Sequence, residues 1–191
     1  MNSAFLVVAT TALLAQQPVA VRGQPSGALP AGPLLDNGDS QALLLGETSA
    51  KAILAHRTAY RDNLAKVKVN ANLRARWSVI RQPLSLVVVF GSWCADSQYH
   101  LPYLLALTAE PNAFIEVRYI GVNRDKKLDP AAWPKGMEPQ ALYRVPTFYL
   151  FATQPGGGQK LMGTVVENPP RAGQSMAEAL VELVESAAKA I

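Results

Sequence analysis

One stretch of the sequence limits the fold more than any other, and it covers residues 84 to 102. It opens with a largely apolar run, Leu84 to Phe90, whose β-branched valines are typical of a buried strand. A short turn follows, and it holds Cys94, the only cysteine of the chain. Asp96 and Ser97 then open an expected helix. The stretch predicts a buried strand, a tight turn and a helix in direct succession.

The place of Cys94 between strand and helix favours a reactive thiol. A side chain there lies beside the unpaired backbone N–H groups and the positive end of the helix dipole. Such surroundings stabilise the thiolate, which is the nucleophilic form of cysteine. A free cysteine often serves as a small core residue instead, but the flanking turn favours the reactive role.

Composition describes a globular protein with few metal-binding side chains. The chain has 191 residues, of which 49% are hydrophobic and 17% charged, so it can bury a core. The net charge is +4 without a pattern of aromatic and basic residues, and we expect no nucleic-acid partner. One cysteine excludes an internal disulfide, and His56 and His100 are not spaced as a metal pair. We therefore expect neither a cofactor nor a metal.

The sequence of the N-terminal region predicts a targeting segment followed by a linker. Residues 3 to 15 are apolar and uncharged, which suits a signal-peptide core and is short for a membrane span. We predict a signal peptide over residues 1–23, hence export to the periplasm or outside the cell, with no stable membrane anchor after cleavage. A buried N-terminal helix is the alternative. Residues 24–40 are rich in proline and glycine and are expected to form a linker.

Residues 41–82 are expected to form an N-terminal helical extension. Apolar residues such as Ile53, Tyr60 and Leu64 recur at helical spacing and form one stripe. The polar face is rich in lysine and arginine. We interpret it as a solvated face, and a docking surface for an acidic partner or an anionic membrane is the alternative.

Residues 83–191 alternate between strand and helix patterns. After the helix that follows Cys94, residues 114–122 alternate apolar and polar positions as a strand does. Residues 144–151 and 160–166 flank a glycine-rich turn and predict a hairpin, and residues 173–191 predict a closing helix. His100 is expected on the surface of the helix that follows Cys94.

Two motifs in this region resemble the thioredoxin superfamily. The run from Trp93 to Ser97 is similar to the Trp-Cys-x-x-Cys motif, with serine in place of the second cysteine. Pro102 stands where these proteins kink the active-site helix, and Val145-Pro146-Thr147 resembles their cis-proline segment. The resemblance covers roughly residues 80 to 191. It implies an α/β thioredoxin-like sandwich, with a central mixed sheet flanked by helices, over residues 83–191.

Within the superfamily, the chain is similar to an exported bacterial group with a Trp-Cys-x-Asp-Ser turn. That group shares a Val-x-Arg-Asp-Lys-like segment and a Val-Glu-Asn-Pro-like stretch, which are residues 122–126 and 166–169 here. Val88 stands where thioredoxins usually carry a buried acid that assists the second cysteine. An apolar residue there agrees with the loss of that cysteine.

The resemblance implies roles for the residues of both motifs. Cys94 attacks a disulfide and forms a mixed disulfide, which Ser97 cannot resolve because an alcohol does not form a disulfide. The catalytic residues are then Cys94 and Ser97, with Ser97 donating a hydrogen bond to the thiolate, and Asp96 modulates the site through its charge or by capping the helix. The substrate-binding residues are Trp93, Val145, Pro146 and Thr147.

These roles predict a single-cysteine thiol–disulfide oxidoreductase or isomerase. Mixed-disulfide formation, isomerisation or deglutathionylation suits one cysteine, with cysteine-containing proteins or small thiols as partners and a reductase that recycles the thiol. One alternative is a redox-inactive module that binds peptides or proteins in the groove of the same fold. Another is a thiol that senses peroxide.

Overall fold

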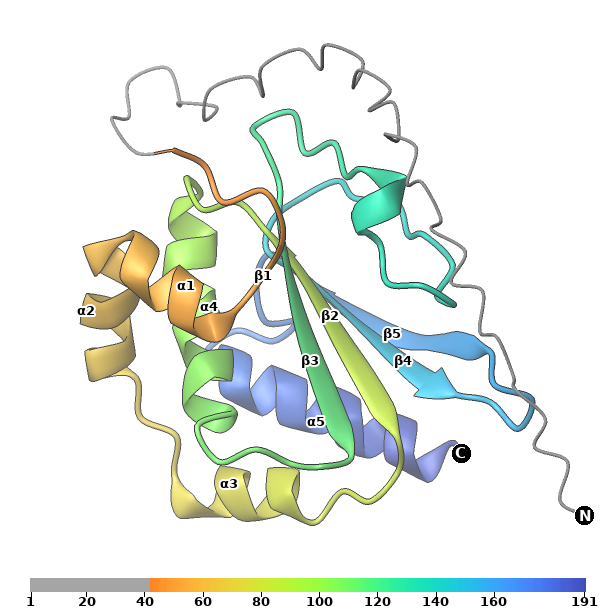
Figure 1. Ribbon diagram of the computed structural model, residues 1–191. Helices are drawn as coiled ribbons and strands as arrows, with labels where there is room; N and C mark the ends of the chain where they lie inside the picture. Colours follow the sequence, from red (N-terminus) through yellow and green to blue (C-terminus); the bar gives the residue numbers. More distant parts are fainter. Residues whose placement is uncertain (1–41) are drawn as a thin grey trace, which may run out of the picture. The chain divides into compact units, whose positions relative to one another are not determined.

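The computed structural model describes residues 42–191, which form an α/β fold around a five-stranded mixed sheet (Figure 1). The expected signal peptide and linker, residues 1–23 and 24–40, lie outside the described residues. The strand order is β1-β3-β2-β4-β5; only β2 and β3 run parallel, and the other neighbours are antiparallel. The strands are β1 (Gly46–Thr48), β2 (Leu84–Phe90), β3 (Ile115–Gly121), β4 (Thr147–Thr153) and β5 (Gln159–Val166).

Five α-helices and one 3₁₀ turn connect or cover these strands. They are α1 (Ala50–His56), α2 (Thr58–Lys66), α3 (Ala71–Ser78), α4 (Ala95–Leu107), η1 (Pro130–Ala132) and α5 (Met176–Lys189). The helical pattern before residue 82 is divided by its caps: Ser49 and Asn70 cap α1 and α3 with their side chains, and extended Arg57 separates α1 from α2. Among residues 42–191, no helix is long and apolar enough to span a membrane.

Strand β2 divides the core because all seven of its residues are buried. Leu86, Val88 and Phe90 face a large apolar cluster to which all five α-helices contribute. Val87 and Val89 face a second cluster on the other side of the sheet. Strands buried on both faces read as continuous apolar runs, which is the pattern of this strand.

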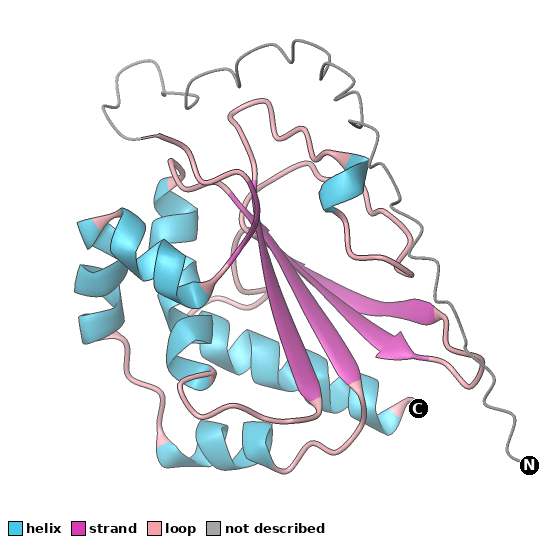
Figure 2. Cartoon of the chain, viewed as in Figure 1, coloured by secondary structure: helices cyan, strands magenta, loops and turns pink. Residues whose placement is uncertain are grey.

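The second face of the sheet is covered by an irregular segment rather than by a long helix. Residues 122–146 include only the short turn η1, and Figure 2 shows this segment opposite the α-helices. Trp133 fills the space under it, with its ring edge-on to Tyr149 and Phe151 at centroid distances of 5.5 and 6.1 Å. Both ends of this segment lead to the residues around Cys94.

Candidate functional site

Cys94 is the N-cap of α4, where β2 has just ended at Phe90. Its backbone is extended, its N–H donates to the carbonyl of Gly91 at 3.0 Å, and its carbonyl accepts from Gln98 N–H at 3.0 Å. Gly91 leaves room for the neighbouring tryptophan, since a Cβ at residue 91 would lie 2.7 Å from the ring of Trp93. The turn thus places the thiol at the positive end of the helix, as the sequence predicts.

The two motifs predicted from the sequence meet at the sulfur of Cys94. The half-buried thiol donates to the carbonyl oxygen of Val145, with 3.3 Å between Sγ and O. The peptide bond between Val145 and Pro146 is cis, and β4 begins at the next residue, Thr147. The Thr147 hydroxyl donates to the carbonyl of Arg144 at 2.7 Å and secures the start of the strand.

Ser97 lies one helical turn after Cys94 and is fully buried. Its hydroxyl oxygen accepts the backbone N–H of Gly91 at 3.3 Å, which fastens the first turn of α4 to the end of β2. The expected hydrogen bond from Ser97 to a Cys94 thiolate stays a prediction. Val88, in the middle of β2, is buried between Tyr119 and Phe148 on the neighbouring strands.

Two contacts hold the side chain of Trp93, the residue before Cys94. Its indole N–H donates to the carbonyl of Val122 at 3.2 Å, just beyond the end of β3. The guanidinium carbon of Arg124 lies 4.8 Å from the centroid of the Trp93 ring, in a cation–π arrangement. Arg124 was not predicted as a site residue, because its contact with Trp93 joins residues far apart in the sequence.

Ser92 is a second residue that sequence reasoning missed. It is fully buried, and its hydroxyl oxygen accepts the backbone N–H of Leu44 at 3.1 Å. The side-chain amide of Gln98 donates to the carbonyl of Ser92 at 2.9 Å. The turn that carries Cys94 is therefore held by contacts with the helix and with the segment before β1.

Asp96 lies in the first turn of α4, where a negative charge interacts favourably with the helix dipole.

The expectation that His100 lies on the surface is wrong. Its side chain is only 6% exposed, and Nε2 lies 3.1 Å from Oδ1 of Asn168, in the turn after β5. Burial lowers the pKa of His100, while the bond to Asn168 and the charges of Asp96 and Glu167 act against that shift. The sequence pattern of the helix alone did not indicate this burial, because the turn after β5 that covers His100 comes much later in the chain.

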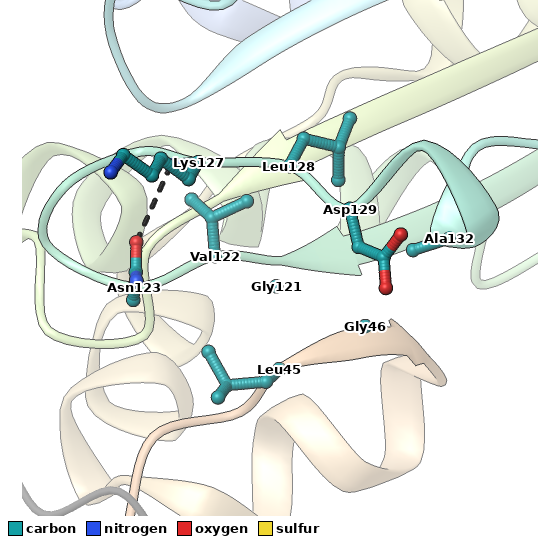
Figure 3. A pocket seen from close by; sticks show the side chains of 9 residues that line it. All are labelled: Leu45, Gly46, Gly121, Val122, Asn123, Lys127, Leu128, Asp129 and Ala132. Atoms are coloured by element: carbon teal, nitrogen blue, oxygen red, sulfur yellow. Dashed lines mark hydrogen bonds between the residues drawn. The ribbon is translucent and has the colours of Figure 1, made fainter.

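A hollow of about 330 Å³ lies between the segment around β1 and the segment after β3 (Figure 3). Its walls are polar and apolar in part, and the backbone N–H of Lys127 donates across one wall to Asn123 Oδ1 at 3.3 Å. Cys94 does not line it, so the hollow is separate from the candidate thiol site. Within residues 42–191, no three His, Cys, Asp or Glu side chains gather into a group that could hold a metal ion.

A family model described as Thioredoxin matches residues 46–170. The chain belongs to this thioredoxin family. The match begins at β1 and so takes in α1, α2 and α3, which precede the strand that leads to Cys94. Family membership and the observed sheet together confirm the α/β thioredoxin-like fold.

Comparison with one of two similar solved structures agrees at the level of the fold. A protein of unknown function from Pseudomonas aeruginosa matches with a TM-score of 0.50 at 18% identity, over 76% of this chain and 94% of that one. An HIV epitope-scaffold matches with a TM-score of 0.48 at 20% identity, over 75% of this chain and 91% of that one. A search of the curated proteins finds no match.

As a thioredoxin-family site, this arrangement offers one thiol and no second sulfur. Cys94 stands at the helix N-terminus, and Ser97 and Val88 are buried at the positions where the resemblance to thioredoxins implies a second cysteine and a buried acid. A single thiol can attack a disulfide and hold the mixed disulfide, and a second molecule must then release it.

Proposed function

We propose that this thioredoxin-family protein carries out monothiol thiol–disulfide exchange through Cys94. The observation that supports this most is the position of the thiol: Cys94 is the N-cap residue of α4, and its Sγ lies 3.3 Å from the carbonyl oxygen of Val145. The half-buried side chain remains partly open to solvent, so a substrate disulfide can reach the sulfur.

Exchange proceeds in two steps whose atoms and electrons balance. The Cys94 thiolate attacks one sulfur of a substrate disulfide, a new S–S bond forms to Cys94, and the other substrate sulfur leaves as a thiolate that takes up a proton. An external thiolate then attacks the mixed disulfide and releases Cys94. Isomerisation or deglutathionylation fits this cycle better than net reduction, because Ser97 cannot complete a disulfide.

Cysteine-containing peptides and proteins suit the surroundings of the thiol. Backbone of an extended substrate can pair with the chain at Val145, as an added strand does at a sheet edge. Trp93 directly precedes Cys94 and is hydrogen-bonded to the carbonyl of Val122, and Thr147 directly follows Pro146 and is hydrogen-bonded to the carbonyl of Arg144. Small thiols are the second substrate class, and a separate reductase would recycle the protein.

Export is part of the same proposal. The uncharged apolar run in residues 3–15 supports a signal peptide, and a periplasmic or secreted location would supply disulfide substrates. Cys94 is the only cysteine of the chain, so it has no partner for an internal disulfide.

Mass spectrometry of intact protein tests the first step. Purified protein is mixed with a peptide that carries a glutathione mixed disulfide, and adducts are quantified before and after addition of dithiothreitol. We expect a reducible adduct on Cys94 and none on Cys94→Ala. Absence of any adduct on the natural protein, at a neutral pH where a free peptide thiol exchanges readily, would contradict the proposal.

A redox-inactive binding module is the second candidate. It is favoured by the replacement of both groups that support dithiol chemistry, since Ser97 and Val88 are buried in their places. If the protein is a binding module, Cys94→Ala should bind a cysteine-containing peptide as tightly as the natural protein does. The exchange proposal predicts that capture of the peptide is lost with the thiol.

A further inference from the structure

The turn that follows β5 connects the two halves of the thiol site. Beyond the last pair of the hairpin, Thr147 with Val166, the backbone N–H of Glu167 donates to the carbonyl of Pro146 at 2.7 Å. Glu167 has a φ of 59°, a conformation that residues other than glycine adopt uncommonly. The N–H of Asn168 then donates back to Val166 at 2.6 Å. This tight turn thus extends the contact of β5 with the segment around Pro146.

The two side chains of the turn reach in different directions. The carboxylate of Glu167 forms an ion pair with Arg144, the residue before Val145. The amide oxygen of Asn168 lies 3.1 Å from Nε2 of His100, which belongs to α4. One turn therefore contacts the segment on both sides of Val145 and the helix whose N-cap is Cys94.

We propose that Glu167 and Asn168 are positioning residues that hold the carbonyl of Val145 opposite the sulfur of Cys94. The inference rests on the proposed exchange at Cys94. It gives the turn a task in that reaction: to keep the substrate-pairing backbone and the thiol at one fixed separation.

The contacts differ in how strongly they can fix this separation. Arg144 is 66% exposed, so its ion pair with Glu167 is screened by water and contributes little. The bond to His100 is better shielded, because the imidazole is 6% exposed and its Nδ1 is buried without a partner among the described residues. With an amide oxygen as partner, Nε2 carries the proton and donates it to Asn168. Loss of this acceptor leaves a buried donor unpaired, and α4 can then shift relative to the turn.

Asn168→Ala tests the proposal with two reagents of different demands. Iodoacetamide needs only the sulfur, whereas a peptide disulfide must also pair with the backbone at Val145. We expect Asn168→Ala to slow mixed-disulfide formation by about tenfold or more, because small misplacements at reacting centres are costly. Alkylation by iodoacetamide should change less than about twofold, since the thiol keeps its helix N-terminus.

Three further variants separate positioning from a general loss of stability. His100→Gln keeps a side-chain N–H donor for Asn168 and should retain the natural ratio of the two rates, whereas His100→Leu should lower it. Asn112→Ala removes a side chain that donates to the carbonyls of Trp77 and Ile80, near the opposite end of α4. It should lower stability and leave the ratio unchanged.

Hydrogen–deuterium exchange supplies a readout that needs no thiol chemistry. In Asn168→Ala, the amides of residues 143–145 and of Thr147 should exchange faster than in the natural protein, while those of β2 should not. If the natural protein forms no mixed disulfide, the proposed function fails, and this measurement still decides the positioning role. Unchanged exchange at residues 143–145 and at Thr147, or an equal fall of the rate ratio in Asn112→Ala, would overturn the inference.

Discussion

At the scale of single residues, the chemistry of the site depends on which side chain occupies position 97, where this chain has a serine. Its hydroxyl accepts the N–H of Gly91 at 3.3 Å and is fully buried, so it supports the turn rather than offering a second reactive group. Cys94, one helical turn earlier, is half-buried and faces Val145. The spacing of the two residues resembles that of a Cys-x-x-Cys pair, with serine in place of the second cysteine.

We predict that Ser97→Cys gains dithiol reductase activity. The new thiol can attack the mixed disulfide at Cys94 and close an internal disulfide, which dithiothreitol then reduces. The gain should be partial, since Val88 supplies no acid beside the new thiol. Sulfur is a weak acceptor for the N–H of Gly91, so unfolding in urea should show a loss of about 0.5–1.5 kcal/mol.

The matched control is Ser97→Ala, which loses the same acceptor and adds no thiol. It should show a similar loss of stability and no gain in dithiothreitol-driven reduction of a protein disulfide. If the natural protein already reduces that disulfide as fast as Ser97→Cys, then Ser97 does not limit turnover.

At the scale of elements, the short strand β1 is held where β3 can approach it closely. Gly46 pairs with Gly121, and a Cβ at Gly121 would overlap the carbonyl oxygen of Leu44. The N–H of Leu44 in turn donates to the hydroxyl of Ser92, two residues before Cys94. The edge of the sheet and the thiol turn are thus connected through Leu44.

Gly121→Ala should therefore destabilise the protein and loosen the thiol turn. The added methyl group must displace backbone, and overpacking of this kind costs about 1–3 kcal/mol. Urea unfolding measures the loss, and hydrogen exchange at Leu44 and around Ser92 should become faster. Gly156→Ala is the control, since a Cβ there meets nothing within 4 Å and should change stability by less than about 0.5 kcal/mol. Equal effects of the two variants would contradict the role given to Gly121.

Most of the sheet and both halves of the site could be predicted from the sequence. The buried run of β2, the turn at Cys94 and the segment at Pro146 each have a strong local pattern. The strand β1 could not, because it is three residues long and is defined by its pairing with β3. The burial of His100 and the contact of Arg124 with Trp93 also depend on residues distant in the sequence, which local periodicity does not report.

At the scale of the whole molecule, stability should depend on pH through His100. Its pKa is lowered from the ordinary value of about 6.5, chiefly by burial, so the unfolded chain takes up the proton at a higher pH than the folded protein. The free energy of unfolding should thus fall as the pH drops below about 6.5, and level off below the folded pKa. The glutamates of α5 with lowered pKa values, Glu178, Glu182 and Glu185, lose their contribution only at more acid pH.

Urea unfolding at pH 7.5 and pH 5.5 measures this dependence. His100→Gln cannot titrate, so the difference in unfolding free energy between the two pH values should be smaller in this variant than in the natural protein. The same difference in both proteins would show that another group carries the dependence.

Turnover of a glutathionylated peptide tests the exchange chemistry of Cys94 most directly. Catalytic amounts of the protein are added to the peptide with an excess of reduced glutathione, and release of the free peptide thiol is followed over time. The natural protein is predicted to release it well above the rate with glutathione alone, and Cys94→Ala is predicted to add nothing to that rate. Equal rates with the natural protein and with Cys94→Ala would contradict a catalytic role for the thiol.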